Sequence, residues 1–302
     1  MTSIGWGKVI LLGEHAVVYG YPALAAALDR GVTMGAIPTP KGGPLRLDVP
    51  AWELAVTAGS TADHPVARAL AAIADALGAG RPALSLVGEA QIPHSAGLGS
   101  SAALAVAVAR AMLVAANRAP DPALIDAAAA ASETLLHGRP SGVDAALAAA
   151  GGVGVFRRAA GLRPIPTPPL RVLVGPSGMP RSTSAMVEAV AAAVGGNASD
   201  ARLAELGALT DDGTAALLAS DLPRLGAAMS RAHEVLAGLG VSNPRLDSLC
   251  EAARAAGAHG AKLTGAGGGG AVIAIAPREK EAAVLTEWRA TDVNGFVATI
   301  GG

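Results

Sequence analysis

The feature that most constrains the fold is a glycine-containing turn that leads directly into a long apolar segment. Residues 97–101 read Gly-Leu-Gly-Ser-Ser, and Arg110 is the only charged residue among residues 102–116. Glycines allow a tight turn, and the start of a helix presents unpaired N–H groups and the positive end of the helix dipole. This pattern favours phosphate binding, and its hydroxyls could also complete a magnesium shell. The alternative is a structural turn whose serine caps the helix.

The same turn does not fit two better-known glycine motifs. No Gly-Lys-Ser or Gly-Lys-Thr follows a glycine at the distance that a Walker loop requires. Nor does a Gly-x-Ser-x-Gly nucleophile elbow surround the serines. The chemistry of the turn therefore has to be inferred from the rest of the chain.

Two carboxylates form a second candidate. Glu133 and Asp144 are eleven positions apart, with a Gly-Arg-Pro-Ser turn at residues 138–141 between them. If that turn folds the chain back, both side chains could face one cleft. Phosphoryl transfer uses such a pair, because one acid can hold magnesium while the other handles the proton of the attacking hydroxyl. The alternative is an Asp that caps a helix and a Glu that is solvated.

Two further segments carry polar or glycine-rich patterns between apolar ones. Residues 262–270 read Lys-Leu-Thr-Gly-Ala-Gly-Gly-Gly-Gly, a loop whose conformational freedom is costly unless close backbone approach offsets it. The alternative for it is a plain flexible hairpin. Near the N-terminus, Lys8 lies in an apolar strand, and Glu14 and His15 follow in a turn. A lysine there either extends to solvent or is directed at an anion, and a lone histidine is often structural.

Composition excludes several classes of protein. The chain has 302 residues and a net charge of -1, without a run of Lys or Arg that could follow a phosphate backbone, so nucleic acid is not expected as a partner. Three Trp, two Tyr and two Phe leave little for stacking on exposed bases. The single Cys250 rules out an intramolecular disulfide framework and predicts a small buried side chain.

The hydropathy pattern gives no sign of an address or a membrane segment. The apolar run at residues 9–12 is too short for the core of a signal peptide. The apolar stretch at residues 102–116 is shorter than a membrane span. We therefore expect a cytoplasmic protein that does not bind a membrane.

The periodicity predicts a mixture of helices and strands without regular alternation, which is typical of the α+β class. Residues 157–170 contain five prolines or glycines and no clear period, so we place a domain junction there, with domains at 1–165 and 166–302. The expected strands and helices are the following. Strands are expected at residues 9–13, 45–49, 52–56, 84–87, 152–156, 171–175, 260–264, 271–276 and 296–300, and helices at 63–77, 101–116, 122–136, 141–149, 246–256 and 278–290.

Taken together, these segments resemble the GHMP small-molecule kinase superfamily, and within it the mevalonate kinase family. Residues 7–20 resemble the first motif of the superfamily, residues 93–103 its phosphate loop and residues 262–270 its third motif. Two further sets are similar to mevalonate kinases in particular. They are Glu133 with residues 137–144, and residues 180–183 with residues 240–247.

The resemblance implies a fold and an activity. The fold would be the two-lobed GHMP kinase fold, with an N-terminal ribosomal-protein-S5-like lobe and a C-terminal ferredoxin-like α/β lobe. The activity would be ATP- and Mg²⁺-dependent phosphorylation of the 5-hydroxyl of mevalonate. The partners would be ATP and this small molecule. A homodimer is common in the family, but the sequence shows no exposed apolar stripe that would establish one.

The resemblance also implies roles for individual residues. Asp144 would be the catalytic carboxylate, with Lys8 beside it, and Ser101 and Glu133 would hold Mg²⁺. The residues expected to bind the nucleotide are Pro93, Ala96, Gly97, Leu98, Gly99, Ser100 and Ser101. The residues expected to contact the substrate or close over it are Glu14, His15, Thr183, Gly265 and Ala266.

Three departures from the family pattern accompany these matches. Ser95 stands where the family more often has Gly, Arg139 where it usually has Asn, and Ala271 where a Cys is often found.

Other acceptors within the superfamily remain alternatives: phosphomevalonate, homoserine or a sugar. Arg139 and Arg181 are the obvious cations for a phosphorylated acceptor. A non-catalytic ATP and metabolite sensor is a further alternative, although Lys8, Glu133 and Asp144 are all present. An RNA-binding module is not expected, because the chain has a net charge of -1 and no run of Lys or Arg.

Overall fold

The computed structural model describes residues 3–59, 64–138, 140–180 and 182–301. These residues form two compact units. The first unit comprises Met1–Gly7, Arg30–His94 and Gly99–Gly151, and the second comprises Lys8–Asp29, Ser95–Leu98 and Gly152–Gly302. Two long strands, β1 (Ser3–Leu12) and β2 (Ala23–Pro38), contribute residues to both units. Each unit is assembled from separate segments of the chain, so the two units do not test the predicted domains at residues 1–165 and 166–302. That division stays a prediction.

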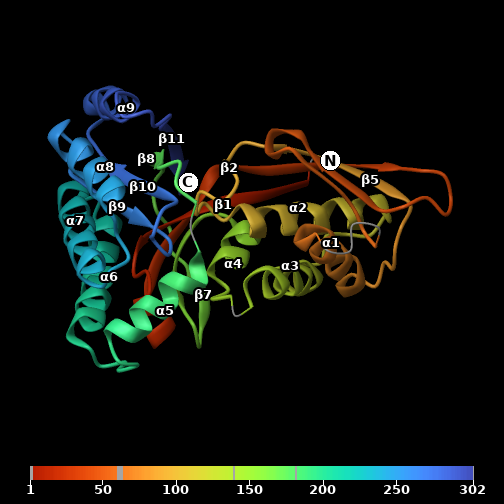
Figure 1. Cartoon of the computed structure of the whole chain (residues 1–302), viewed down its shortest axis with the longest axis horizontal. Coiled ribbons are helices and arrows are strands. Elements are labelled where there is room, and N and C mark those ends of the chain that lie inside the picture. The colour runs from red at the N-terminus through yellow and green to blue at the C-terminus, as the bar shows by residue number, and fades with distance from the viewer. Residues whose placement is uncertain (1–2, 60–63, 139, 181, 302) are drawn as a thin grey trace. The chain divides into compact units, whose positions relative to one another are not determined.

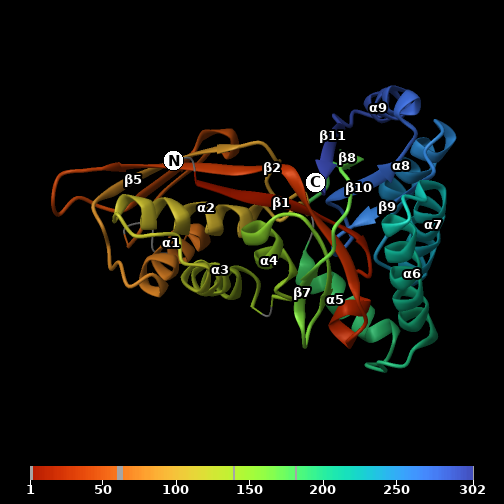
Figure 2. The ribbon, with the colours of Figure 1, turned by 180° about the vertical axis from the view of Figure 1, so that it is seen from behind.

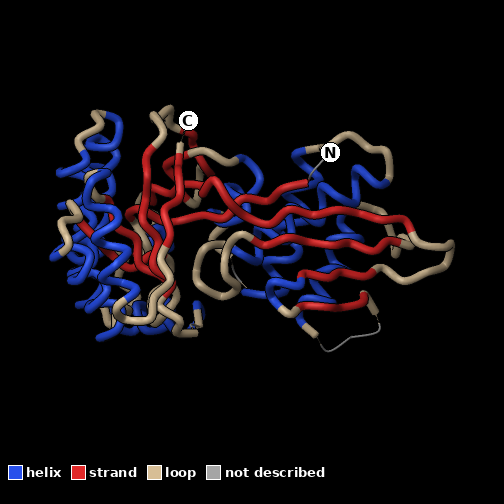
Figure 3. Tube along the Cα trace, turned by 90° about the horizontal axis from the view of Figure 1, so that it is seen from above, coloured by secondary structure: helices blue, strands red, loops and turns tan. Residues whose placement is uncertain are grey.

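The first unit is a sheet covered by helices. Its strands run in the order β4-β3-β5-β2, with β3 parallel to β5 and the other pairs antiparallel. In Figure 3 the strands of this unit form one layer and its helices lie behind them. The elements of this unit are β3 (Arg46–Val49), a 3₁₀ turn (Pro50–Trp52), β4 (Leu54–Thr57), α1 (Pro65–Ala76), β5 (Leu84–Ala90), α2 (Ser100–Ala115), α3 (Pro122–His137) and α4 (Val143–Ala150).

Helix α2 is the central element of the first unit. Most of its residues are buried on every side, as expected for an alanine-rich helix that is apolar all round. It contacts α1, α3 and α4 (Figure 1). On the strand side, a Cβ added to Gly5 would lie 2.0 Å from the carbonyl oxygen of Ala103, so only glycine permits this approach. The helix that begins at the glycine-containing turn is thus fixed firmly in the core.

The second unit contains a four-stranded antiparallel sheet in the order β11-β8-β10-β9. In chain order these are its fourth, first, third and second strands, the ferredoxin-like arrangement that the family resemblance implies. Helices α7 and α8 pack against β9 and β10, and α6 packs on α7 (Figure 2). The elements of this sheet and its cover are β8 (Leu170–Pro176), α5 (Thr183–Ala193), α6 (Ala201–Leu218), α7 (Leu222–Gly238), α8 (Pro244–Ala255), β9 (Gly260–Thr264), β10 (Ala271–Ile275), a 3₁₀ turn (Arg278–Lys280), α9 (Glu281–Arg289) and β11 (Phe296–Ile300).

The second unit also holds the first part of β2, which pairs with β6 (Val153–Arg157), and β6 pairs with β7 (Gly161–Pro164). A 3₁₀ turn at Ala16–Tyr19 follows β1. Strand β7 lies in the stretch that the sequence predicts to be an irregular junction. Its residues Gly-Leu-Arg-Pro carry too little alternation to indicate a strand, and backbone pairing with β6 forms it.

Most other predictions about the fold are confirmed. The expected strands and helices are present within a few residues of their bounds, except that β1 begins at Ser3, well before the strand expected at residues 9–13, and the class is α+β. Cys250 is fully buried in α8, and burial raises the pKa of its thiol to about 12. Within the described residues, no helix is both long and apolar enough to cross a membrane.

Candidate active site

The turn at residues 97–101 positions the start of α2. Gly99 is the N-cap of this helix, in the left-handed conformation with φ of 73°, and no side chain caps the helix. By contrast, α1, α3, α5, α6, α7 and α8 each begin with a side-chain cap. The alternative in which a serine merely caps α2 is therefore wrong. The first N–H groups of α2 keep the capacity to bind an anion.

Residues 95–98 of the same segment belong to the second unit, where Lys8 of β1 lies against them. The Lys8 backbone N–H donates to the Leu98 carbonyl at 2.9 Å, and its Nζ donates to the Gly97 carbonyl at 3.2 Å. The side chain is only 2% exposed, so this lysine does not extend to solvent. Ser95 has φ of 59°, a left-handed conformation that glycine adopts more readily than serine.

Ser101, Glu133 and His137 of the first unit meet at one point. The Ser101 hydroxyl is 3.2 Å from His137 Nε2, and Glu133 Oε2 is 3.9 Å from the same nitrogen. Glu133 lies on α3 and is buried, so the alternative of a solvated glutamate is wrong. The fold brings the hydroxyl and the carboxylate that the family resemblance assigns to Mg²⁺ to the same histidine. His137 is a neighbour of both that sequence reasoning did not single out as a contact.

Asp144 is half-buried in the first turn of α4. The N-cap of α4 is Gly142, with φ of 88°, and this helix too begins without a side-chain cap. Asp144 is thus not the helix-capping aspartate of the alternative. That Asp144 and Glu133 face one cleft stays a prediction.

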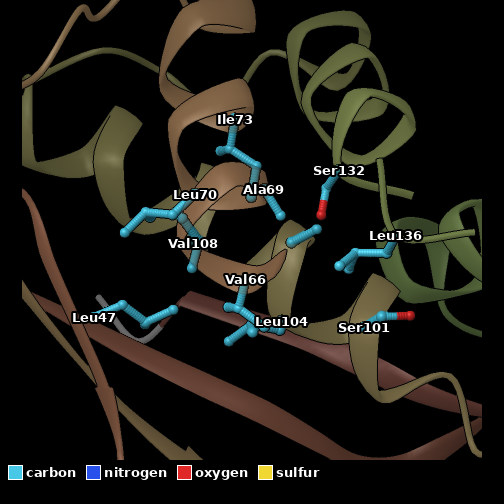
Figure 4. A pocket seen from close by; sticks show the side chains of 11 residues that line it. Leu47, Val66, Ala69, Leu70, Ile73, Ser101, Leu104, Val108, Ser132 and Leu136 are labelled. Carbon is cyan, nitrogen blue, oxygen red and sulfur yellow. The ribbon is translucent and has the colours of Figure 1, made fainter. Parts of the chain in front are cut away.

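Two hollows of different kinds lie in the first unit. One, of about 10 Å³, is lined mainly by apolar side chains of α1, α2 and α3, with Ser101 at its edge (Figure 4). It is large enough for about one water and for no nucleotide. The other is an open groove of about 490 Å³ formed by residues 51–53 and 90–94, which include Pro93. In it, Trp52 Nε1 donates to the Ile92 carbonyl at 3.0 Å, and the rings of Trp52 and His94 are 5.4 Å apart.

In the second unit, the turn after β1 is joined to β9 and the loop that follows it. Thr264 Oγ1 accepts from the Ile10 N–H at 2.9 Å and donates to the Ile10 carbonyl at 3.0 Å. His15 Nε2 contacts the Ala266 carbonyl at 2.8 Å, and the His15 backbone has φ of 60°, an unfavourable value for this residue type. These contacts tie two segments that are about 250 positions apart in the chain.

Glu14 and Lys262 form a buried ion pair at the same place. The exposed fractions of their side chains are 1% and 0%, and Lys262 Nζ also donates to the Leu263 carbonyl at 2.6 Å. Burial raises the pKa of Glu14, and the charge of Lys262 opposes this rise; burial likewise lowers the pKa of Lys262. The sequence marks both residues within motifs, but local patterns cannot reveal that they pair.

The glycine-rich loop is packed closely, so the alternative of a flexible hairpin is wrong. A Cβ on Gly267 would lie 2.1 Å from the Val241 carbonyl oxygen, and one on Gly268 would lie 2.6 Å from Met186 Sδ. The Gly268 N–H donates to the Val241 carbonyl at 2.8 Å. Thr183 is the exposed first residue of α5 and shares a face with Met186, three positions on. Gly265, with φ of 80°, begins this loop.

Residues 240–247, which the sequence analysis relates to the mevalonate kinase family, form a polar network behind the loop. Asp247 accepts from Ser242 and lies 3.1 Å from His233 Nε2. His233 Nδ1 accepts from the Leu263 N–H at 3.3 Å, so the other nitrogen carries the proton and donates to Asp247. Burial lowers the pKa of His233. Arg139 and Arg181 lie outside the described residues.

Two family models match the chain. The GHMP kinases N-terminal domain matches residues 64–152, and the GHMP kinases C-terminal domain matches residues 214–294. A mevalonate kinase from Thermococcus sibiricus is 34% identical over 304 residues, covering 92% of this chain and 90% of its own length. A mevalonate kinase from Aeropyrum pernix is also 34% identical, covering 89% of this chain and 86% of its own.

Solved structures agree with the family models. The mevalonate kinase of L. major in complex with R-mevalonate has a TM-score of 0.86 and 27% identity, covering 100% of this chain and 96% of its own. The Methanococcus jannaschii mevalonate kinase has a TM-score of 0.85 and 27% identity, covering 100% and 98%. A galactokinase from Lactococcus lactis, at 18% identity and a TM-score of 0.79, shares the fold alone. The chain therefore belongs to the GHMP kinases and, within them, to the mevalonate kinase family.

Proposed function

We propose that the protein transfers the γ-phosphoryl group of ATP to the 5-hydroxyl of mevalonate, giving 5-phosphomevalonate and ADP. The observation that carries this proposal is identity of 34% to mevalonate kinases over about nine-tenths of both chains. The L. major structure, which contains R-mevalonate and covers the whole of this chain, supports the same substrate.

The backbone of residues 97–101 binds the phosphates of ATP in this proposal. The support is the uncapped start of α2, where N–H groups and the helix dipole favour negative charge. The open groove at residues 51–53 and 90–94 includes Pro93 and suits the base, because it combines the ring of Trp52 with both apolar and polar side chains. The hollow of about 10 Å³ is far too small to hold a nucleotide base.

Ser101 and Glu133 would hold Mg²⁺. Their donors are oxygens, which this hard cation prefers, and both lie against His137. Magnesium commonly takes one or two protein ligands and completes its shell with water and substrate phosphates, so two protein donors suffice. When bound, the ion neutralises charge on the transferring phosphoryl group.

Asp144 and Lys8 carry the chemistry in this proposal. The oxygen of the mevalonate 5-hydroxyl forms a bond to the γ-phosphorus while the bond from that phosphorus to the bridging oxygen of ADP breaks. Asp144 accepts or orients the proton that leaves the hydroxyl. Lys8, held against the Gly97 carbonyl, favours the negative charge that develops near the phosphoryl group.

The substrate residues are Glu14, His15, Thr183, Gly265 and Ala266. The contact of His15 with Ala266 and the packing of α5 on the loop support a common location for these residues within the second unit. A homodimer and a cytoplasmic location stay predictions.

A coupled ADP-release assay with MgATP tests the proposal. The panel is mevalonate, 5-phosphomevalonate, homoserine and galactose, each over a range of concentrations. Turnover with mevalonate alone is the expected result. Turnover with another acceptor would keep the kinase and discard the substrate contacts. No turnover with any of them, while ATP still binds, would favour the sensor alternative.

A further inference from the structure

Lys262 has no role in the proposed reaction, yet it is one of the largest fully buried side chains of the described residues. Its ammonium is bound by Glu14 Oε1 and by the Leu263 carbonyl. Replacing a buried ion pair by apolar residues is often neutral or stabilising. Stability alone therefore does not account for a lysine at this position.

The location of the pair connects it to the substrate residues. Glu14 precedes His15, whose ring contacts the Ala266 carbonyl, and Lys262 lies on β9 just before the glycine-rich loop. The Thr264–Ile10 hydrogen bonds fix the same two segments a short distance along β9. The ion pair is thus part of the framework around residues that are proposed to contact mevalonate.

The two oxygens of Glu14 are in different situations. Oε1 accepts from Lys262, whereas Oε2 is buried and has no hydrogen-bond partner among the described residues. A buried carboxylate oxygen without a partner is costly, and in a native protein it calls for an explanation. A hydroxyl group of a bound substrate is a donor that would satisfy it.

Further hydrogen bonds hold the backbone next to Lys262. The adjacent Leu263 N–H donates to His233 Nδ1, and His233 donates in turn to Asp247. These contacts fix the backbone of β9 next to Lys262, and the buried ammonium is also bound to the Leu263 carbonyl, so it has little freedom to release Glu14. A group fixed in this way is suited to orienting another side chain.

We infer that Lys262 is a positioning residue for the reaction: it holds Glu14 Oε1 so that Oε2 is presented to a hydroxyl group of the substrate. This inference rests on the proposed function and deepens it, because it assigns the orientation of one substrate residue to another residue. Lys262 itself does not touch the substrate in this account.

A double-mutant cycle between Glu14→Gln and Lys262→Met tests the inference, with KM and kcat measured for mevalonate and for ATP. Methionine keeps most of the length of lysine and removes the charge. Lys262→Met should raise KM for mevalonate about tenfold, equivalent to about 1.4 kcal/mol, because Glu14 then no longer holds its hydrogen bond to the substrate in place. KM for ATP should stay within about twofold. In the Glu14→Gln background, Lys262→Met should have no further effect on KM.

Thr264→Val is the matched control. It removes the side-chain hydrogen bonds between β1 and β9 at nearly constant volume and leaves Glu14 and Lys262 intact. If it reproduces the rise in KM, loosened strand packing is the cause and the inference is wrong. Unchanged KM in Lys262→Met, with only a lower melting temperature, would also overturn it. Additive effects in the double variant would mean that Lys262 acts on the substrate directly, which contradicts a positioning role.

Two further comparisons cover the other outcomes. Lys262→Met leaves Glu14 unpaired and could therefore fail to fold. In that case the double variant, which has neither charge, is compared with Glu14→Gln alone, and a different KM for mevalonate contradicts the inference. The wild-type protein serves as the separate test of the proposed function. Failure of the wild type to turn over mevalonate contradicts that function, whereas unaltered KM in Lys262→Met of an active enzyme contradicts only the inference.

Discussion

Asp144 stands in the first turn of a helix whose N-cap is a glycine, so no capping role explains its presence. Asp144→Asn should lower kcat at least about a hundredfold, because proton transfer by a positioned group typically contributes that much. The dissociation constant of ATP should stay within about twofold. Steady-state kinetics and nucleotide titration measure the two quantities. Asp126→Asn, an exposed position on α3, is the control that should keep full activity. More than about a tenth of wild-type activity in Asp144→Asn would exclude a proton-handling role.

Glu133 is buried beside Ser101 and His137, an arrangement that suits a ligand better than a surface charge. Glu133→Gln should raise the Mg²⁺ concentration for half-maximal activity about tenfold, the loss that even a partner of a metal ligand can cause. The measurement is a magnesium titration at fixed ATP. A curve that coincides with the wild type would remove Glu133 from the metal site.

At the scale of single elements, the glycine-rich loop depends on close approach as well as on backbone freedom. Gly267→Ala should lower the free energy of unfolding by about 2 kcal/mol or more, because it combines a left-handed conformation with overpacking against the Val241 carbonyl. Gly196→Ala has a similar φ of 70° but no atom within 4 Å of the added Cβ, so it should cost only about 1 kcal/mol. Urea unfolding compares them. Equal losses would show that the loop is not closely packed.

The link between β8 and α9 should depend on pH. Arg171 donates to both oxygens of Glu281, at 2.8 and 2.7 Å, and these bonds hold the pKa of Glu281 below its ordinary value of 4.5. A lowered pKa contributes stability that is present above about pH 4.5 and is lost as the pH falls through the folded-state value. Glu281→Gln should therefore destabilise the protein at pH 7 and much less near pH 3. Glu287→Gln, exposed on the same helix, should show no such pH dependence. A constant difference for Glu281→Gln would contradict the link.

Elements with strong local signals could be predicted from the sequence, and those formed by pairing could not. The alanine-rich α2 and the buried strands β9 and β10 follow from apolar runs and glycine boundaries. Strand β7 has neither an apolar run nor a clear alternation, and it forms because its backbone pairs with β6. The Glu14–Lys262 pair joins residues 248 positions apart, a distance over which no periodicity carries information. Both residues lie in motifs that can be recognised in the sequence, but only the fold shows that they pair.

At the scale of the whole molecule, the division into two units does not follow the chain. Strands β1 and β2 each give residues to both units, so neither unit can unfold without disrupting both strands. We expect one cooperative unfolding transition. Trp52 reports on the first unit and Trp288 on the second, so Trp52→Phe and Trp288→Phe variants, each also carrying Trp6→Phe, give single reporters. Coincident urea midpoints are the expected result. Separated midpoints would show that the units unfold independently.

The most direct test of the proposed function is to identify the product that the wild-type enzyme forms. The protein is incubated with MgATP and R-mevalonate, and the product is examined by phosphorus NMR with proton coupling. The account predicts one phosphomonoester whose phosphorus couples to the methylene protons at carbon 5, formed in equal amount to ADP. ADP without that ester, or no product while ATP remains bound, would contradict the claim.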